Sequence, residues 1–201
     1  DEQAEAEFRK TAPKAGPSRV VRFVSGRYQR AWVKNVAAIG NASGFVEPLE
    51  ATALGVIGIQ SRLLAGALIE GDRVVLGAQV EQFNRFHQRN WDSIRGFIAV
   101  HYKFNTRLDT PFWRECREKT DLSVAGPIVR HYQENGPGSF WEPTLFDPVD
   151  QFKMAGYAAL LVGQKAPCRR EAQPTPAEMR QWQAVRELSL IHISEPTRQA
   201  E

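Results

Sequence analysis

Hydrophobic residues recur at helical spacing in the centre of the chain, and this pattern begins near Ala51. Leu54, Ile57, Leu64 and Leu68 follow at intervals close to whole helical turns, with further apolar residues beside them. Residues at such intervals share one face of an α-helix. The sequence therefore predicts a long amphipathic helix from about residue 51.

A second hydrophobic stripe predicts a long helix over about residues 74–102. His87 and His101 fall within this stripe, so both are expected on its apolar face. They lie 14 residues apart in sequence. At a rise of about 1.5 Å per residue, this separation is about 21 Å, which is too far for one metal ion. We therefore expect interior or interface histidines with hydrogen-bond partners, and no metal site. The other apolar members of the stripe are Val80, Phe83, Ile94 and Phe97.

Strand-like composition is confined to the first fifth of the chain. Apolar and β-branched residues are concentrated in residues 19–26, RVVRFVSG, and in residues 31–40, AWVKNVAAIG. The first segment predicts a strand, and VAAI in the second predicts a short buried strand. With a few strands at the start and helices after them, the predicted fold class is α+β and mainly helical. Because so few strands do not form a self-sufficient sheet, we expect that sequence upstream is missing. Further helices are expected over residues 1–12, 109–118, 122–134, 150–163 and from Thr175, with a loop over residues 135–143.

The loop between the predicted buried strand and the first long helix contains the most suggestive chemistry. Residues 40–50 read GNASGFVEPLE. Glycine allows a backbone to come close to a ligand, and a helix N-terminus attracts anions. Glu47 and Glu50 also have a simpler explanation, because acids near a helix start stabilise it by about 0.3–1 kcal/mol. These residues alone indicate a possible ligand loop and do not identify the ligand.

The composition is that of an ordinary globular protein. The 201 residues are 42% apolar and 24% charged, with a net charge of +3. No basic stripe with interleaved aromatic residues is present, so no nucleic-acid partner is expected. No uninterrupted apolar run approaches the ~20 residues that a membrane span needs, so no membrane association is expected. Cys116 and Cys168 lie far apart and outside any CxxC pattern, which indicates a reducing, cytoplasmic environment.

The two ends of the chain suggest a fragment with a foreign tail. Residues 188–198, LSLIHISEPTR, differ from the preceding Arg-, Glu- and Gln-rich segment and resemble a translated sequencing-library adapter. The alternative is a genuine amphipathic tail. We therefore exclude residues 188–201, including His192, from functional reasoning. The first residue is Asp1 rather than Met, and we expect that sequence upstream is missing.

Three motifs resemble the flavin-dependent tryptophan halogenase family. Residues 26–35, GRYQRAWVKN, and 38–54, AIGNASGFVEPLEATAL, resemble its hallmark W-x-x-N-x-x-x-I-G followed by G-F-x-E-P-L-E-[SA]-T. Residues 101–116, HYKFNTRLDTPFWREC, and 156–164, GYAALLVGQ, are similar to two further family blocks. The resemblance covers nearly all of residues 1–187.

This resemblance implies the end of an FAD-binding α/β domain followed by the helical substrate region of a halogenase. Residues 1–54 would belong to the FAD-binding region, residues 55–187 to the substrate region, and residues 188–201 to the non-native tail. Reduced FAD, supplied by a separate flavin reductase, would react with O2 to a flavin hydroperoxide. Halide would then give hypohalous acid, which halogenates an aromatic, indole- or tryptophan-like small molecule.

The family's motif also implies site residues. Glu50 matches the active-site glutamate, which would assist the electrophilic chemistry on the aromatic ring. The backbone amides of Thr52 and Ala53 match the halide site. Glu47 is expected to have a structural role, and Trp32 to pack behind the flavin wall. That wall would be formed by Gly40, Ala42, Gly44, Phe45 and Pro48.

Several departures from the family pattern limit what the chain alone is expected to do. Ala51-Thr52-Ala53 stands where the family often has Ser-Thr-Gly, which places a methyl group beside the halide site. Asp147 and Phe152 are the nearest matches to the substrate-gripping residues, and they match poorly. An indole other than free tryptophan, a phenol or a pyrrole is therefore an equal candidate substrate.

Other family motifs are missing from this sequence. The GxGxxG turn, the W-x-W-x-I-P block and the catalytic lysine belong upstream in the family, so the chain alone is expected to be inactive. Two alternatives stay open at this point: a related flavin monooxygenase that hydroxylates its substrate, and a non-catalytic helical binding module.

Overall fold

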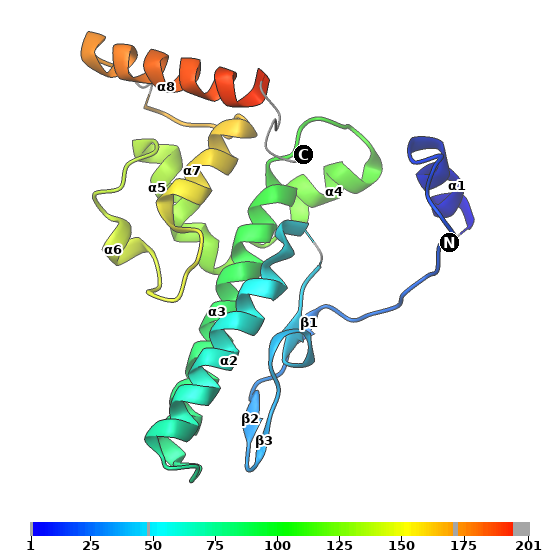
Figure 1. Cartoon of the computed structure of the whole chain (residues 1–201). Coiled ribbons are helices and arrows are strands. Elements are labelled where there is room, and N and C mark those ends of the chain that lie inside the picture. Colours follow the sequence, from blue (N-terminus) through cyan, green and yellow to red (C-terminus); the bar gives the residue numbers. More distant parts are fainter. Residues whose placement is uncertain (1, 48, 171–172, 195–201) are drawn as a thin grey trace. The chain divides into compact units, whose positions relative to one another are not determined.

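The computed structural model describes residues 2–47, 49–170 and 173–194 (Figure 1). It forms two compact units. The first comprises Asp1–Ala99 with Asp147–Gln151, and the second comprises Val100–Phe146 with Phe152–Glu201. The predicted boundary between residues 54 and 55 separates an FAD-binding region from a substrate region. It concerns function rather than compactness, and it stays a prediction.

The first unit is built on two long helices. As the sequence predicts, α2 spans Thr52–Glu70 and α3 spans Gly77–Lys103, of which the part up to Ala99 belongs to this unit. The two helices lie side by side (Figure 1). Helix α2 ends at Gly71, whose N–H group donates to the Ala67 carbonyl at 3.0 Å. The predicted N-terminal helix is also present, as α1, Glu2–Thr11.

The strands of the first unit are much shorter than predicted. Strand β1, Gly26–Arg27, pairs antiparallel with β4, Gly44–Phe45. Strand β2, Trp32–Val33, forms a hairpin with β3, Val36–Ala37, around a turn in which Lys34 has a φ of 54°.

The prediction of a strand over residues 19–26 was therefore wrong except at its last residue. Val24 is 92% exposed and lies outside any strand. The prediction of a buried VAAI strand was also wrong, since only Val36 and Ala37 are in a strand and Val36 is 67% exposed. Strands need a neighbour for their backbone hydrogen bonds. In the described residues, each of these short strands has one two-residue partner.

A buried side chain of α3, Asn84, is hydrogen-bonded to the backbone of the hairpin. Asn84 Oδ1 accepts hydrogen bonds from the N–H groups of Ala31 and Trp32, at 2.7 and 2.9 Å, and its Nδ2 donates to the Trp32 carbonyl at 2.8 Å. Beside it, the rings of Trp32 and Phe83 meet edge to face at 5.5 Å. Ala31, Trp32 and Phe83 form a buried cluster with Leu63, Leu64, Ala67 and Val80 packed against it.

The second unit is helical, as predicted. Local sequence explains where α4 begins and where α5 ends. Thr110 caps α4 by accepting from the Trp113 N–H group at 3.4 Å, and Pro111 occupies the first turn. Gly136, with a φ of 79°, ends α5. The helices are α4 Pro111–Lys119, α5 Gly126–Asn135, α6 Glu142–Leu145, α7 Lys153–Gly163 and α8 Pro176–Ser194, with a short 3-10 helix, η3, over Ser123–Ala125.

The predicted helix start at Thr175 is confirmed by a capping box. Thr175 Oγ1 accepts from the Glu178 N–H group at 3.3 Å, while Glu178 Oε2 accepts from the Thr175 N–H group at 2.7 Å. The Glu178 carboxylate accepts from the Thr175 N–H group and, at 2.8 Å, from the Thr175 hydroxyl, and these two bonds hold the pKa of Glu178 below its usual value. Residues 195–201 of the predicted foreign tail lie outside the described residues.

One described segment, Leu49–Glu70, is long and apolar enough to cross a membrane by length and composition. A single such helix is weak evidence for a span, because core helices share these properties. The middle of this one also contains Gln60, which is fully buried and hydrogen-bonded within the first unit. The absence of a membrane partner stays a prediction.

Candidate ligand site at the start of helix α2

The predicted ligand loop is a chain of very short elements. The 3-10 helix η1, Gly40–Ala42, leads to β4, and a second 3-10 helix, η2, Leu49–Ala51, leads into α2. Within η2, Glu50 and Ala51 have φ angles of 65° and 49°. Two successive non-glycine residues in the left-handed region are strained by about 1–2 kcal/mol each. Such strain is concentrated at functional sites in proteins, and Glu50 is the predicted catalytic residue.

The start of α2 has the features of an anion site. Its N-cap residue, Ala51, makes no side-chain capping hydrogen bond. The amides of Thr52 and Ala53 are among the first four N–H groups of the helix, which lack partners within it. Both residues are partly exposed. Because the N-terminus of a 19-residue helix also has a positive dipole end, these amides fit the predicted halide site.

The structure gives the two loop glycines a role in packing. A Cβ on Gly40 would overlap the Ile57 side chain of α2. A Cβ on Gly44 would lie 2.9 Å from both Arg27 Cβ and a ring carbon of Trp91. Both glycines are buried against their own chain. Their predicted contact with a flavin is not needed to explain them, and it stays a prediction.

The other predicted flavin contacts differ in accessibility. Ala42 is exposed, whereas Phe45 is partly buried and meets the ring of Phe23 edge to face at 4.9 Å. Pro48 lies outside the described residues. Trp32 is only 2% exposed, so it lies in the interior, and its place behind a flavin wall stays a prediction. The predicted contact of these residues with a flavin stays a prediction.

The two weakly matched substrate residues are in different units. Asp147, in the first unit, forms an ion pair with Arg89 at 2.5 Å and accepts from the Val149 N–H group at 2.9 Å. Phe152, in the second unit, precedes α7 as its N-cap residue. These contacts hold Asp147 within the first unit, and the predicted substrate binding by Asp147 and Phe152 stays a prediction.

The sequence alone did not reveal a buried polar cluster behind the loop. Ser43, Gln60 and His87 each have 0% exposure and are hydrogen-bonded to one another or to the loop backbone. Burial lowers the pKa of His87 below its ordinary value of 6.5. The signal that could have found the cluster is Gln60, a polar residue at helical spacing from Val56 and Leu64 and therefore on the apolar face of α2.

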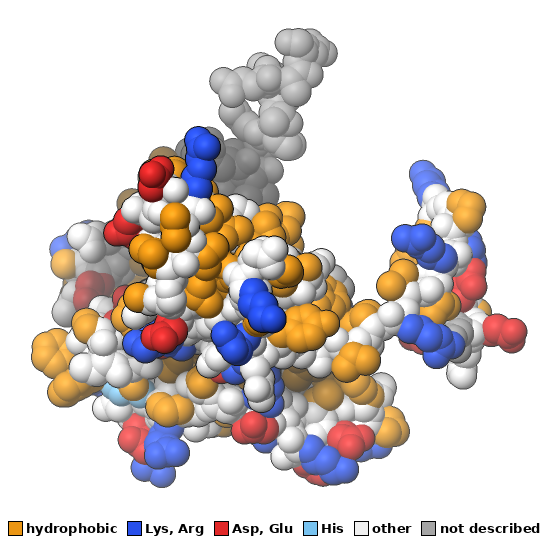
Figure 2. Space-filling model, turned by 90° about the horizontal axis from the view of Figure 1, so that it is seen from below, with side chains coloured by type: hydrophobic (Ala, Val, Ile, Leu, Met, Phe, Trp, Pro, Cys, Tyr) orange, Lys and Arg blue, Asp and Glu red, His pale blue; other side chains and the backbone are white. Residues whose placement is uncertain are grey.

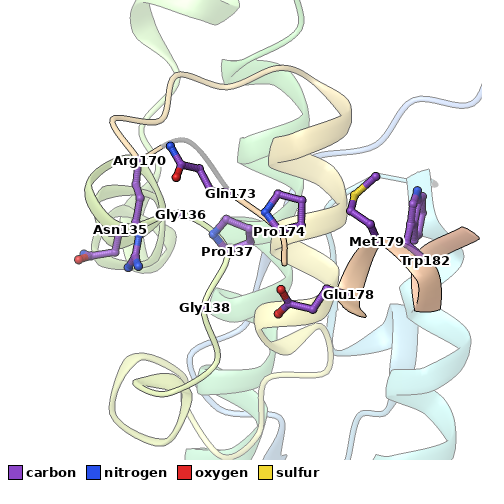
Figure 3. Close-up of a pocket in the computed structure, with 10 residues that line it drawn as sticks. All are labelled: Asn135, Gly136, Pro137, Gly138, Arg170, Gln173, Pro174, Glu178, Met179 and Trp182. Atoms are coloured by element: carbon purple, nitrogen blue, oxygen red, sulfur yellow. The ribbon is translucent and has the colours of Figure 1, made fainter. Parts of the chain in front are cut away.

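Two cavities lie away from this loop. One, of about 980 Å³ in the second unit, is bounded by the loop after α5 and by Met179 and Trp182 of α8 (Figure 3). The other, of about 700 Å³ in the first unit, lies between α2 and α3 over Leu63, Ala67 and Phe83. Neither contains a predicted site residue. Among the described residues, no group of three or more His, Cys, Asp or Glu could hold a metal ion.

A sequence model of the tryptophan halogenase family matches residues 1–179. The chain therefore belongs to the tryptophan halogenase family. This agrees with the family resemblance of its motifs, and its partial, mainly helical fold is that of a halogenase segment.

Individual relatives are similar over parts of their length. The chain is 42% identical to the tryptophan 6-halogenase ThaL of Streptomyces albogriseolus over 98 residues, which are 49% of this chain and 18% of that protein. It is 39% identical to the tryptophan 7-halogenase RebH of Lentzea aerocolonigenes over 136 residues, 63% of this chain and 24% of that protein.

Among solved structures, MibH, a lanthipeptide tryptophan 5-halogenase, superimposes with a TM-score of 0.81 and 35% identity. The match covers 94% of this chain and 37% of MibH. The chain thus spans well under half of the relatives that it matches.

Proposed function

We propose that residues 1–187 are the C-terminal portion of an FADH2-dependent halogenase that acts on an aromatic small molecule. The observation that carries this proposal is the local geometry of residues 50–53. Glu50 is exposed and has a left-handed backbone, and it lies two residues before α2 begins at Thr52, where the N-cap residue Ala51 makes no side-chain capping hydrogen bond.

This arrangement suits the proposed reaction. Reduced FAD, together with O2 and halide, would supply the electrophilic halogen. The amides of Thr52 and Ala53 would hold the halide, and the backbone at Ala42 and Phe45 would face the cofactor. Glu50 would orient a proton-donating or positively charged partner. As the aromatic ring is substituted, its carboxylate would stabilise the positive charge on the ring or accept the proton that the ring loses.

An exposed apolar surface supports the view that more protein covers this unit. On α2, Leu54 is 73% exposed and Ile69 is 80% exposed. Figure 2 shows one face of the molecule, with many hydrophobic side chains between the charged ones. Apolar side chains exposed at both ends of one helix are often covered by another domain or partner. We propose that the upstream part of the same protein covers α2.

The substrate, partners and location follow from the same proposal. The relatives' names specify tryptophan at ring positions 5, 6 and 7, while the poor match at Asp147 and Phe152 leaves another indole, a phenol or a pyrrole as an equal candidate substrate. A separate reductase would supply the flavin in its reduced form. The free thiols of Cys116 and Cys168 are consistent with a cytoplasmic location.

Recovery of the complete reading frame tests the proposal at the level of sequence. Long-read sequencing of the locus should reveal a strand-GxGxxG-helix segment, a W-x-W-x-I-P block and a lysine upstream of Asp1, without LSLIHISEPTR downstream. A frame that opens near Asp1 with no nucleotide-binding turn would contradict the proposal and leave Glu50 as a helix-start acid.

A further inference from the structure

A closed ring of hydrogen bonds lies directly behind the candidate ligand loop. Gly40 N–H donates to Gln60 Oε1 at 2.7 Å, and Gln60 Nε2 meets His87 Nδ1 at 3.2 Å. His87 Nε2 meets the Tyr28 carbonyl at 2.8 Å. The Tyr28 N–H group donates to the Ser43 carbonyl at 3.0 Å, and Ser43 Oγ donates to the Gly40 carbonyl at 2.8 Å. The ring thus ties both ends of η1 to α2, to α3 and to the residue after β1.

The direction of every bond in this ring is fixed by chemistry. A backbone N–H group can only donate, so Gln60 must present its oxygen to Gly40 and its NH2 group to His87. An amide NH2 group can only donate, so His87 Nδ1 must accept. Since a carbonyl can only accept, His87 Nε2 must carry the proton that is donated to Tyr28. The ring therefore requires a neutral His87 in its Nε2–H form.

Protonation of His87 would break the ring. A proton on Nδ1 would face the Gln60 NH2 group, so that two donors would oppose each other. Turning the Gln60 amide would relieve that conflict but would place its NH2 group against the Gly40 N–H group. Gln60, His87 and Ser43 have 0% exposure, so an unpaired donor among them would be costly.

Two charged side chains near His87 shift its pKa in opposite directions. Arg27 of β1 disfavours a charged imidazole and Asp92 of α3 favours it, and the two form an ion pair at 2.8 Å. The hydrogen bond to Tyr28 raises the pKa of His87, whereas burial, the largest influence, lowers it. Protonation is thus expected only in acid, below the range of an exposed histidine.

We propose that Gln60 and His87 are positioning residues that hold the loop leading to Glu50, and that they hold it only while His87 is neutral. Gly40 and Ser43 begin the segment that leads to Phe45, Glu50 and the start of α2. The importance of this segment for catalysis rests on the proposed function. Neither Gln60 nor His87 needs to touch a ligand for this role. Their effect is to fix the loop backbone.

Replacing Gln60 by glutamate, which has nearly the same shape, should reverse the protonation state of His87 that the ring requires. In Gln60→Glu, one carboxylate oxygen can accept from the Gly40 N–H group, while the other can accept only from a protonated His87 Nδ1. The ring can then close with a charged imidazole. The pKa of His87 should move from below its ordinary value in the wild type to above it in the variant. Gln82→Glu, on the exposed side of α3, adds the same charge away from the ring and should leave the pKa of His87 unmoved.

The first readout is ¹⁵N NMR of histidine-labelled complete protein, with the His87 signals assigned by their loss in His87→Gln. The expected wild-type result is an Nε2–H imidazole that stays neutral while exposed histidines titrate. An Nδ1–H form, an ordinary titration or an unchanged pKa in Gln60→Glu would overturn the proposal. This readout needs no flavin, so it stands or fails separately from the proposed function.

The second readout is halogenation as a function of pH in the complete protein. Wild type should lose kcat as His87 becomes protonated in acid, whereas Gln60→Glu should keep its activity there and lose it as His87 deprotonates at higher pH. Gln60→Leu, which cannot form the ring at any pH, should lose about 100-fold in kcat/KM throughout. Identical pH profiles for wild type and Gln60→Glu would overturn the positioning role. If wild-type protein shows the expected imidazole signals but no halogenation, the proposed function is contradicted, while the hydrogen-bond ring and its neutral His87 remain supported.

Discussion

Gly40 and Ile57 are packed so closely that a β-carbon on the glycine would overlap the isoleucine side chain. Gly40 also has a φ of 54°, which favours glycine. The contact joins the candidate ligand loop to the first turns of α2. Loop and helix start are therefore one packed structure, and the glycine is required by the protein's own interior.

Replacement of Gly40 by alanine should destabilise the protein. The added methyl group meets Ile57, and the left-handed backbone adds strain, so we expect a loss of about 2–3 kcal/mol in the free energy of unfolding. Gly58→Ala is the matched control. It lies in the same helix as Ile57, nothing is within 4 Å of the new methyl group, and helix propensity favours alanine by about 1 kcal/mol. Urea unfolding of both variants checks this; equal effects would contradict the packing role of Gly40.

Asn84 should be one of the costliest polar residues to replace. Its truncation to alanine would remove the partners of three backbone groups of Ala31 and Trp32, which are themselves buried. At about 1 kcal/mol or more for each unsatisfied group, the loss should reach about 3 kcal/mol. Gln82→Ala, on the exposed side of the same helix, should change stability by less than about 0.5 kcal/mol. A small loss for Asn84→Ala in thermal or urea unfolding would show that the hairpin is held in another way.

The burial of His87 should make stability depend on pH. The pKa of His87 is lower in the folded state than its ordinary value of 6.5, so the unfolded chain binds the proton more readily. The stabilisation is complete above pH 6.5 and is lost as the pH falls from there through the lower, folded-state pKa. The slope contributed by this one group is at most about 1.4 kcal/mol per pH unit. This contribution is measured by the free energy of unfolding of wild type and His87→Gln at a series of pH values. Equal slopes of that free energy against pH would show that His87 does not contribute.

The strain at Glu50 and Ala51 predicts opposite effects on stability and activity. Glycine adopts left-handed φ angles without penalty, so Ala51→Gly and Glu50→Gly should each raise stability by about 1 kcal/mol. In the complete enzyme, Ala51→Gly should keep most of its activity. Glu50→Gly should lose about 100-fold or more in kcat, because the carboxylate is gone. Full activity in folded Glu50→Gly would remove Glu50 from the chemistry.

The long helices could be predicted from sequence because their signals are local. The apolar spacing of α2 and α3, the Thr110 cap and the Thr175 capping box depend on neighbouring residues in the chain. The strands could not be predicted in the same way. Val20 and Val24 have strand composition, but no strand pairs with them in the described residues.

The candidate site was predicted only in part, and for a similar reason. The family motif pointed to Glu50, Thr52 and Ala53, and the structure adds the strained backbone that places them. It also assigns Gly40 and Gly44 to contacts with Ile57 and Trp91, which lie 17 and 47 residues further along the chain. These contacts leave no local sequence pattern, and the ring through Gln60 and His87 leaves only one local trace, the polar Gln60 on the apolar face of α2.

The most direct test of the central claim is the mass spectrum of the product made by the complete protein. The protein would be supplied with a flavin reductase, FAD, O2, chloride or bromide and a panel of indoles, phenols and pyrroles. The account predicts a product with the isotope pattern of one added halogen, which follows the halide supplied and is lost in Glu50→Gln. A product that carries one added oxygen, or no product from protein that binds reduced FAD, would contradict it.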